Sequence, residues 1–207
     1  MNWRDQASRL YAILDASCFS SLQLLLDAAN ELASAGLKVI QYRNKSADAR
    51  SMLQQARELK GRIGSRAKLI MNDRADLCLA AEFDGVHVGQ DDLLPESARM
   101  IIGTHRCLGV STHNPEQVAE ADRTSADYIA IGPVFATASK LNPDPVVGLA
   151  GVHRARELTR KPLVAIGGIT RQNCLSVIDA GADSIAVISD LVRHSGKSAE
   201  EFSRILG

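Results

Sequence analysis

The chain has 207 residues, 45% of them hydrophobic, which suits one sizeable core or at most two small domains. Its 24 basic residues balance its 24 acidic residues, so net charge gives no electrostatic reason to expect a nucleic-acid partner or an anionic membrane surface. The N-terminal stretch MNWRDQASRL lacks the apolar segment of a signal peptide, and no apolar run approaches the roughly 18 residues of a membrane span. The four cysteines match no zinc or redox spacing. We therefore expect a cytoplasmic protein with reduced cysteines.

Short apolar runs recur along the whole chain and predict eight strands. Most of them are continuous rather than alternating, which is typical of strands that are covered on both faces. In chain order the expected strands are LYAIL (10–14), KVIQY (38–42), KLIM (68–71), GVHV (85–88), CLGV (107–110), YIAI (128–131), LVAI (163–166) and SIAVI (184–188).

Helical patterns occupy the intervals between these runs. They show apolar residues with a helical period, and residues that favour helix ends flank them. The expected boundaries are Leu22 to Gly36, a start at Ser46, a start at Asn114 in NPEQ, Thr170 to Gly181, and a capping box at Ser198 to Glu201.

Strand–helix alternation of this kind builds parallel sheets with right-handed crossovers. Eight such units close most naturally into a compact α/β fold, a single (β/α)8 barrel that spans residues 1–207, with eight parallel strands. An open doubly wound sheet is the main competitor, although it usually has fewer strands. One stretch, 133–148, breaks the alternation with three prolines and no helical period, and such long connections are usually functional.

In a barrel of this type the active site lies at the C-terminal rim, on the loops that follow the strands. Each strand after the first is followed by polar or glycine residues. These are Gln41, Arg43, Lys45, Asn72, Asp73, Arg74, Gly89 to Asp92, Ser111, Gly132, Thr137, Ser139, Lys140, Gly167 to Ile169, and Ser189. Taken singly, each has an ordinary explanation as a helix cap or a solvated charge, and His87 on the fourth strand is typical of a buried core histidine. Their shared position at one rim favours a binding site.

Two different anion sites are expected at this rim. Gly167 and Gly168 after the seventh strand, with Ser189 after the eighth, expose backbone N–H groups where such barrels commonly hold a phosphate monoester. On the other side, the paired carboxylates Asp73 and Asp92 suit Mg²⁺.

Arginine and lysine near those carboxylates suit the oxygens of a diphosphate. Arg43, Lys45 and Lys140 are the candidates. Two phosphate-bearing ligands that face each other suggest group transfer with pyrophosphate as the leaving group.

The residues also carry a family resemblance over nearly the whole chain. The matching motifs are QYRNK, MNDRADL, GVHVGQDDL, GVSTH, DYIAIGPVFATASK, VAIGGIT and GADSIAVIS. In order and spacing they closely resemble the thiamine-phosphate synthases, also called thiamine-phosphate pyrophosphorylases. That family joins 4-amino-5-hydroxymethyl-2-methylpyrimidine diphosphate to a thiazole phosphate and releases pyrophosphate.

The resemblance implies a role for each matching residue. The implied Mg²⁺ ligands are Asp73 and Asp92. The implied catalytic residues are Arg43, Lys45, Ser111 and Lys140. The implied substrate-binding residues are Gln41, Tyr42, Arg43, Asn44, Lys45, Asn72, Ser111, Thr137, Ala138, Ser139, Lys140, Gly168, Ile188 and Ser189.

Two departures from the family pattern are small. Tyr42 stands where leucine or phenylalanine is expected, and Ser139 replaces a threonine but keeps the hydroxyl. Two alternative functions remain open at this point: a thiazole tautomerase of the same superfamily that needs no metal, and a barrel that binds phosphate ligands without turnover. Asp73 and the acidic end of GQDD favour the synthase over the tautomerase.

Overall fold

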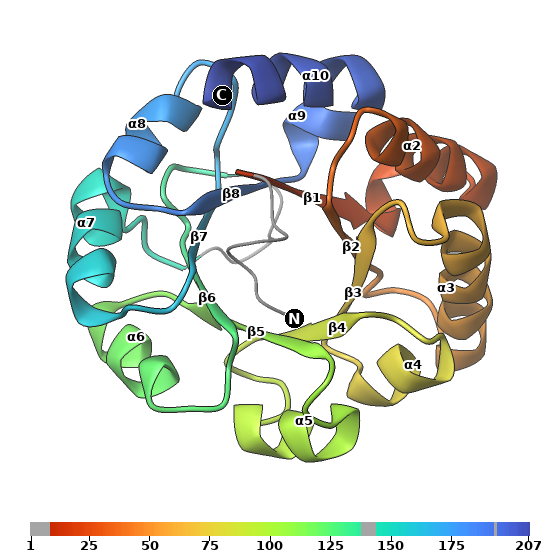
Figure 1. Cartoon of the computed structure of the whole chain (residues 1–207), viewed down its shortest axis with the longest axis horizontal. Helices are drawn as coiled ribbons and strands as arrows, with labels where there is room; N and C mark the ends of the chain where they lie inside the picture. The colour runs from red at the N-terminus through yellow and green to blue at the C-terminus, as the bar shows by residue number, and fades with distance from the viewer. Residues whose placement is uncertain (1–8, 138–143, 193) are drawn as a thin grey trace.

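A computed structural model describes residues 9–137, 144–192 and 194–207 of the chain. Eight strands form a closed barrel in which each strand pairs in parallel with the next, and β1 pairs with β8 (Figure 1). The strands are β1 Leu10–Asp15, β2 Val39–Arg43, β3 Lys68–Asn72, β4 Gly85–Val88, β5 Cys107–Thr112, β6 Tyr128–Ile131, β7 Leu163–Ile166 and β8 Ser184–Val187. The predicted (β/α)8 barrel and all eight predicted strands are therefore confirmed.

The helices form an outer ring around the barrel (Figure 1). They are η1 Ala16–Cys18, α2 Leu22–Ser34, α3 Ala49–Ile63, α4 Ala75–Ala80, α5 Pro95–Ile102, α6 Pro115–Asp122, α7 Gly148–Leu158, α8 Cys174–Asp179, α9 Ser189–Val192 and α10 Ser195–Leu206. Among the described residues, no helix is both long enough and apolar enough to cross a bilayer.

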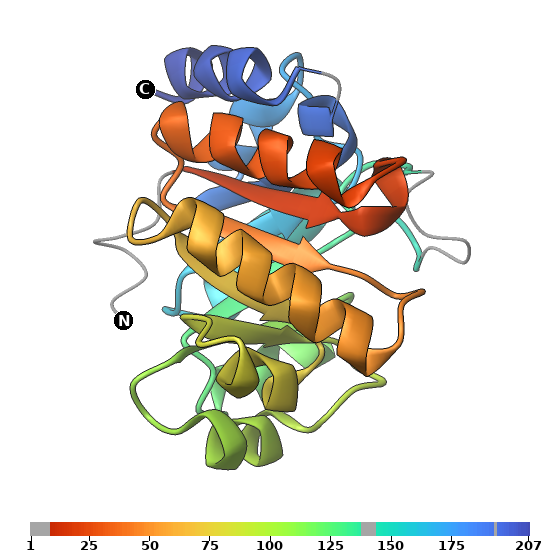
Figure 2. The same ribbon diagram turned by 90° about the vertical axis from the view of Figure 1, so that its right-hand side faces the viewer.

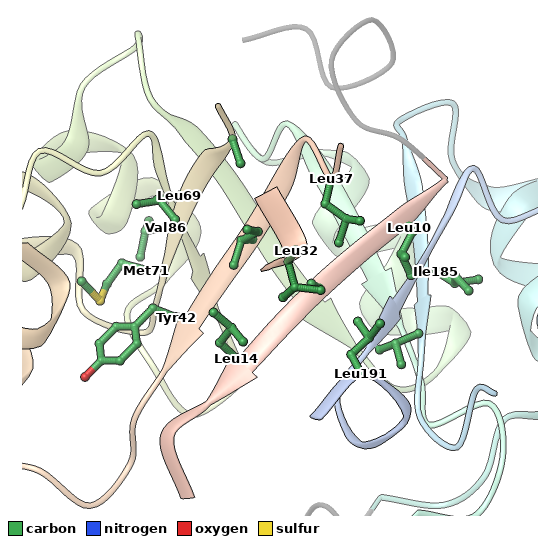
Figure 3. Close-up of a cluster of buried hydrophobic side chains, with 14 of the residues drawn as sticks. Leu10, Leu14, Leu32, Leu37, Tyr42, Leu69, Met71, Val86, Ile185 and Leu191 are labelled. Carbon is green, nitrogen blue, oxygen red and sulfur yellow. The ribbon is translucent and has the colours of Figure 1, made fainter. Parts of the chain in front are cut away.

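Alternate residues along each strand serve two different cores. One set points outward and packs under the helices, as Leu14 on β1 does on the side of Leu32 on α2 (Figure 3). The other set points into the barrel, where Tyr11, Ile13 and Tyr128 belong to a second cluster. This two-residue period follows from strand geometry, and it decides which side chains after position 40 enter the barrel and which face a helix.

Several predicted helix ends are confirmed and three are wrong. Asn114 caps α6 by accepting the Gln117 N–H, as predicted. The three wrong starts were Ser46, Thr170 and Ser198. Helix α3 starts after Asp48, and α8, which follows β7, starts after Asn173 and ends at Asp179. The last helix, α10, already begins at Ser195. Asp48 and Asn173, which also favour helix starts, lie within three positions of the first two predicted starts, and the last helix begins after His194, whose side chain makes no capping hydrogen bond.

All strands run in the same direction, so their carboxyl ends meet at one end of the barrel (Figure 2). The opposite end carries a repeated stabilising contact. Asp84, Asp127 and Asp183 stand directly before β4, β6 and β8, and each carboxylate accepts a backbone N–H from the first or second residue of the preceding strand at 2.7–3.0 Å. Each also pairs with a lysine or arginine. Neighbouring strands are thereby tied together at the end of the barrel that is usually devoted to stability.

We expect Asp127→Ala to lower the free energy of unfolding by about 1.5–3 kcal/mol, the contribution of a hydrogen bond to a charged group. The variant loses the acceptor of the Leu108 N–H and the partner of Arg99. Urea unfolding followed by circular dichroism measures the change. Asp179→Ala is the matched control, because Asp179 is exposed, and we expect a change within about 0.5 kcal/mol. Equal effects in the two variants would contradict the proposed contact.

Candidate active site

A cavity of about 580 Å³ opens among the loops at the carboxyl end of the strands. Eleven of the residues predicted from sequence line it. They are Gln41, Arg43, Lys45, Asn72, Asp73, Asp92, Ser111, Thr137, Gly168, Ile188 and Ser189. The predicted residues Ala138, Ser139 and Lys140 lie outside the described part of the chain.

The end of β2 divides its side chains between the cavity and a helix. Gln41, Arg43 and Lys45 occupy alternate positions and line the cavity. Tyr42 and Asn44, which were also predicted to contact substrate, occupy the intervening positions and turn the other way. Both donate hydrogen bonds to Gln55 Oε1 on α3, at 2.5 and 3.1 Å. The strand period explains this division.

Asn44 shapes the loop that follows β2. Its side-chain oxygen accepts the backbone N–H groups of Ser46 and Ala47, both at 3.1 Å. The loop between these anchors carries Lys45 at the cavity. We therefore infer that Asn44 and Tyr42 position the loop from behind, without touching the contents of the cavity through their side chains.

One wall of the cavity combines two carboxylates with cations. Asp73 and Asp92 lie within hydrogen-bonding reach of each other, and Lys45 Nζ lies 2.5 Å from Asp73 Oδ2. Burial, together with the neighbouring Asp92 carboxylate, raises the pKa of Asp73 to about 6 despite the opposing effect of Lys45. Asp92 is held in place by the Gly89 N–H, which donates to it at 2.8 Å. Crowded carboxylates of this kind are stabilised by a bound cation.

The donor set fits Mg²⁺ better than a softer metal. No group of three or more histidine, cysteine, aspartate or glutamate side chains that could hold a metal occurs within the described residues. Two carboxylates alone fit an ion that takes one or two protein oxygens and completes its shell with water and phosphate oxygens. The pair Asp73 and Asp92 meets that requirement.

Asp15 at the end of β1 is a site residue that the sequence reasoning missed. Its buried carboxylate forms an ion pair with Arg43 and accepts the backbone N–H and hydroxyl of Ser17. Asp15 therefore fixes the Arg43 guanidinium at the rim. A signal was present, because Asp15 is the polar residue that follows the first strand, as Asn72 and Asp73 follow the third.

The opposite wall is built of backbone rather than charge. Gly168 has a φ of +62°, and a Cβ there would lie 2.5 Å from the Ala136 carbonyl oxygen. Its own carbonyl accepts from Asn173 Nδ2 at 3.0 Å, while its N–H donates to no acceptor in the described residues. Ile188 and Ser189 from the end of β8 line the same wall. Only glycine allows the chain to pass this closely to the loop after β6 at this positive φ.

An ion-pair cluster holds the two loops of this wall together. The Arg171 guanidinium binds Asp190 at 2.8 Å and also pairs with Glu201 on α10, and the Arg171 backbone N–H donates to Asp190 at 3.1 Å. The loop after β7 is thereby fixed to the start of α9. No sequence motif had singled out Arg171 or Asp190, because their contact joins segments 19 residues apart.

The barrel and its rim cavity define an enzyme that acts on small molecules at the carboxyl ends of its strands. Residues 10–191 match the family model described as thiamine monophosphate synthase. The chain is 58% identical over 201 residues to the thiamine-phosphate synthase of Koribacter versatilis, covering 96% of this chain and 95% of that protein. It is 40% identical to that of Methanosarcina mazei, covering 87% and 76%.

A solved structure agrees with the sequence relatives. The thiamine phosphate pyrophosphorylase from Pyrococcus furiosus superposes with a TM-score of 0.87 at 32% identity, and the match covers 99% of this chain and 98% of that one. The chain therefore belongs to the thiamine monophosphate synthase family, and it is a transferase.

Proposed function

We propose that the protein makes thiamine phosphate from 4-amino-5-hydroxymethyl-2-methylpyrimidine diphosphate and a thiazole phosphate, with Mg²⁺ as its cofactor. In this reaction the bond between the pyrimidine methylene carbon and the diphosphate oxygen breaks, and pyrophosphate leaves with the electron pair. The thiazole nitrogen lone pair then forms the new bond to that carbon. The observation that carries the proposal is the cavity itself, in which a wall of carboxylates and cations faces a wall of glycine backbone.

Asp73 and Asp92 would hold Mg²⁺, which when bound supplies positive charge to the diphosphate oxygens. Arg43 and Lys45 bind the same anion, and they stabilise the charge that grows on it as the carbon–oxygen bond breaks. Arg43 does this as a planar fork, already oriented by Asp15. Because these cations are in place before the bond breaks, little reorganisation opposes the reaction.

The second substrate binds at the glycine wall. The backbone N–H of Gly168 and the hydroxyl of Ser189 offer donors for its phosphate monoester. Anchored there, the thiazole faces the methylene carbon across the cavity. The attacking nitrogen already carries a lone pair, so the reaction needs no general base.

Carboxylate pairing also distinguishes the synthase from the alternatives. A tautomerase that needs no metal gives no reason to place two acids within hydrogen-bonding reach, since their repulsion opposes folding. A barrel that only binds phosphates has no need of cations fixed on a leaving group.

All four cysteines of the sequence are described and free, which supports our placement of the enzyme in the reducing cytoplasm.

The decisive experiment mixes purified protein with both substrates and measures thiamine phosphate and pyrophosphate in the same samples. We expect equal amounts of the two products with Mg²⁺, and none after EDTA treatment until Mg²⁺ is restored. Full turnover in EDTA would overturn the role of the metal. Binding of both substrates without any pyrophosphate would overturn the synthase.

A further inference from the structure

The loop between β7 and α8 turns two successive carbonyl groups away from the cavity. Gly167 accepts the Phe135 N–H at 3.0 Å, and Gly168 accepts from Asn173 Nδ2, also at 3.0 Å. Neither donor residue lines the cavity, although Gly167, Gly168 and Ile169 all do. Donors behind the glycine wall therefore occupy the two oxygens that could otherwise face an anion in the cavity.

The N–H groups of the same two peptides have no acceptor. A peptide unit is planar and trans, so its N–H points opposite to its carbonyl oxygen. The Gly168 N–H is thus directed away from Phe135, and the Ile169 N–H away from Asn173. Neither N–H donates to an acceptor within residues 9–137, 144–192 and 194–207. Ile169 is only 6% exposed, and buried N–H groups are almost always paired, so the partner of its N–H has to come from the cavity.

Asn173 makes both of its side-chain hydrogen bonds to this loop. Its Nδ2 donates to the Gly168 carbonyl, and its Oδ1 accepts the Thr170 N–H at 2.8 Å. A carbonyl can only accept and a backbone N–H can only donate, so the orientation of the Asn173 amide is unambiguous. Asn173 stands at the start of α8, where asparagine usually caps the helix, yet its side chain makes no capping hydrogen bond. The side chain supports the loop instead of the helix.

Glycine makes this support from outside the loop necessary. Gly167 and Gly168 have φ values of +102° and +62°, and glycine adopts backbone conformations that other residues avoid. The peptide between Gly168 and Ile169 could therefore rotate and turn its carbonyl oxygen into the cavity. That oxygen carries partial negative charge and would repel a phosphate. The Asn173 donor stabilises the opposite orientation.

We propose that Asn173 is a positioning residue for the phosphate monoester that binds at the glycine wall. It holds the Gly168 carbonyl behind the wall, and it thereby presents the Ile169 N–H to the anion beside the Gly168 N–H. Asn173 touches no substrate and acts only through this peptide. The inference rests on the proposed function for the identity of the phosphate, a thiazole phosphate, but not for the orientation of the peptide.

Asn173→Asp tests the donor alone. Aspartate keeps the shape of the side chain and an acceptor for the Thr170 N–H, while the Gly168 carbonyl loses its donor and meets a carboxylate oxygen. We expect KM for the thiazole phosphate to rise about 10- to 100-fold, as for one lost hydrogen bond to a charged group, and KM for the pyrimidine diphosphate to stay almost unchanged. Steady-state kinetics with each substrate varied in turn measure both values. An unchanged KM for the thiazole phosphate, or an equal rise in both KM values, overturns the proposal.

The added negative charge needs its own control, and Gln172 provides it. Gln172 is exposed and precedes Asn173 in the same loop, so Gln172→Glu adds the same charge and should leave both KM values almost unchanged. Asn173→Ala removes the donor without adding charge, and it should also raise KM for the thiazole phosphate. If Gln172→Glu matches Asn173→Asp, or if Asn173→Ala keeps the KM of the unmodified protein, charge explains the effect and the proposal fails.

Nuclear magnetic resonance tests the orientation of the peptide without turnover. Inorganic phosphate is the probe, because it offers the same anionic oxygens as a phosphate monoester. We expect phosphate to shift the amide proton signals of Gly168 and Ile169 downfield in the unmodified protein, and the Ile169 shift to be lost in Asn173→Asp. An Ile169 signal of the unmodified protein that does not respond to phosphate overturns the proposal, even where the variants fail to fold. If the unmodified protein makes no thiamine phosphate, the proposed function fails, while this titration still decides the orientation of the peptide.

Discussion

Asp92→Asn is expected to lower kcat by about two to three powers of ten at a fixed Mg²⁺ concentration, the scale seen when one preorganised charge-stabilising group is removed. The substitution removes the anionic oxygen that would bind the ion, while the amide oxygen still accepts the Gly89 N–H. The loop therefore stays in place and only the charge changes. Initial rates over a range of Mg²⁺ concentrations measure the effect, and half-saturation should move upward by at least about tenfold.

A matched control lies one position away. Asp91 also lines the cavity, but it is exposed and is not one of the two proposed metal ligands, so Asp91→Asn removes the same charge from the same loop and should leave the Mg²⁺ titration almost unchanged. Asp73→Asn should resemble Asp92→Asn, since asparagine tolerates the left-handed backbone (φ 61°) that Asp73 adopts.

Thermal unfolding adds a readout that is free of catalysis. Mg²⁺ together with pyrophosphate should raise the Tm of the unmodified protein and fail to raise that of Asp92→Asn. An Mg²⁺ titration of Asp92→Asn that matches the unmodified protein would remove Asp92 from the metal site.

The strands could be predicted from sequence because each one is a local signal. A continuous apolar run such as YIAI needs no knowledge of its neighbours to indicate a strand covered on both faces, and the structure confirms it as β6. Helix starts were less predictable. Thr170 and Asn173 are both good capping residues, and Asn173 instead accepts the Thr170 N–H through its side chain. Contacts with the rest of the fold decide such choices, and local propensity does not contain them.

Site residues could be predicted where the type and strand position of a single residue indicate its role. They could not be predicted where the role depends on a contact between residues far apart in the sequence. Gln41, Arg43 and Lys45 could be placed together because the strand period sends them to one side. His87 was correctly expected to be buried, but its link to Tyr128 spans 41 residues, and the link of Tyr128 to Tyr11 spans 117. No sequence window includes such a pair.

Gly168→Ala is expected to raise KM for the thiazole phosphate by about 10- to 100-fold, while KM for the pyrimidine diphosphate changes little. A Cβ at this position would lie 2.5 Å from the Ala136 carbonyl oxygen and 2.8 Å from the Phe135 Cβ, so the loops after β6 and β7 must move apart. The Gly168 N–H then leaves the place where we propose that it binds the phosphate, and a hydrogen bond to a charged group is worth about 1.5–3 kcal/mol. Steady-state kinetics with each substrate varied in turn measure the difference.

Backbone strain alone must be separated from this loss, and Gly64 provides the comparison. Its φ of +59° nearly equals the +62° of Gly168, yet a Cβ there meets nothing within 4 Å, and it follows α3. Gly64→Ala should therefore cost the roughly 1–2 kcal/mol of stability that a left-handed alanine brings, with both KM values unchanged. If Gly168→Ala loses the same stability and also keeps its KM for the thiazole phosphate, strain is its whole effect, and the phosphate does not bind at the glycine wall. A rise in KM confined to the thiazole phosphate instead requires that this wall and the Asp73–Asp92 wall bind different substrates, which is the arrangement that group transfer across the cavity needs.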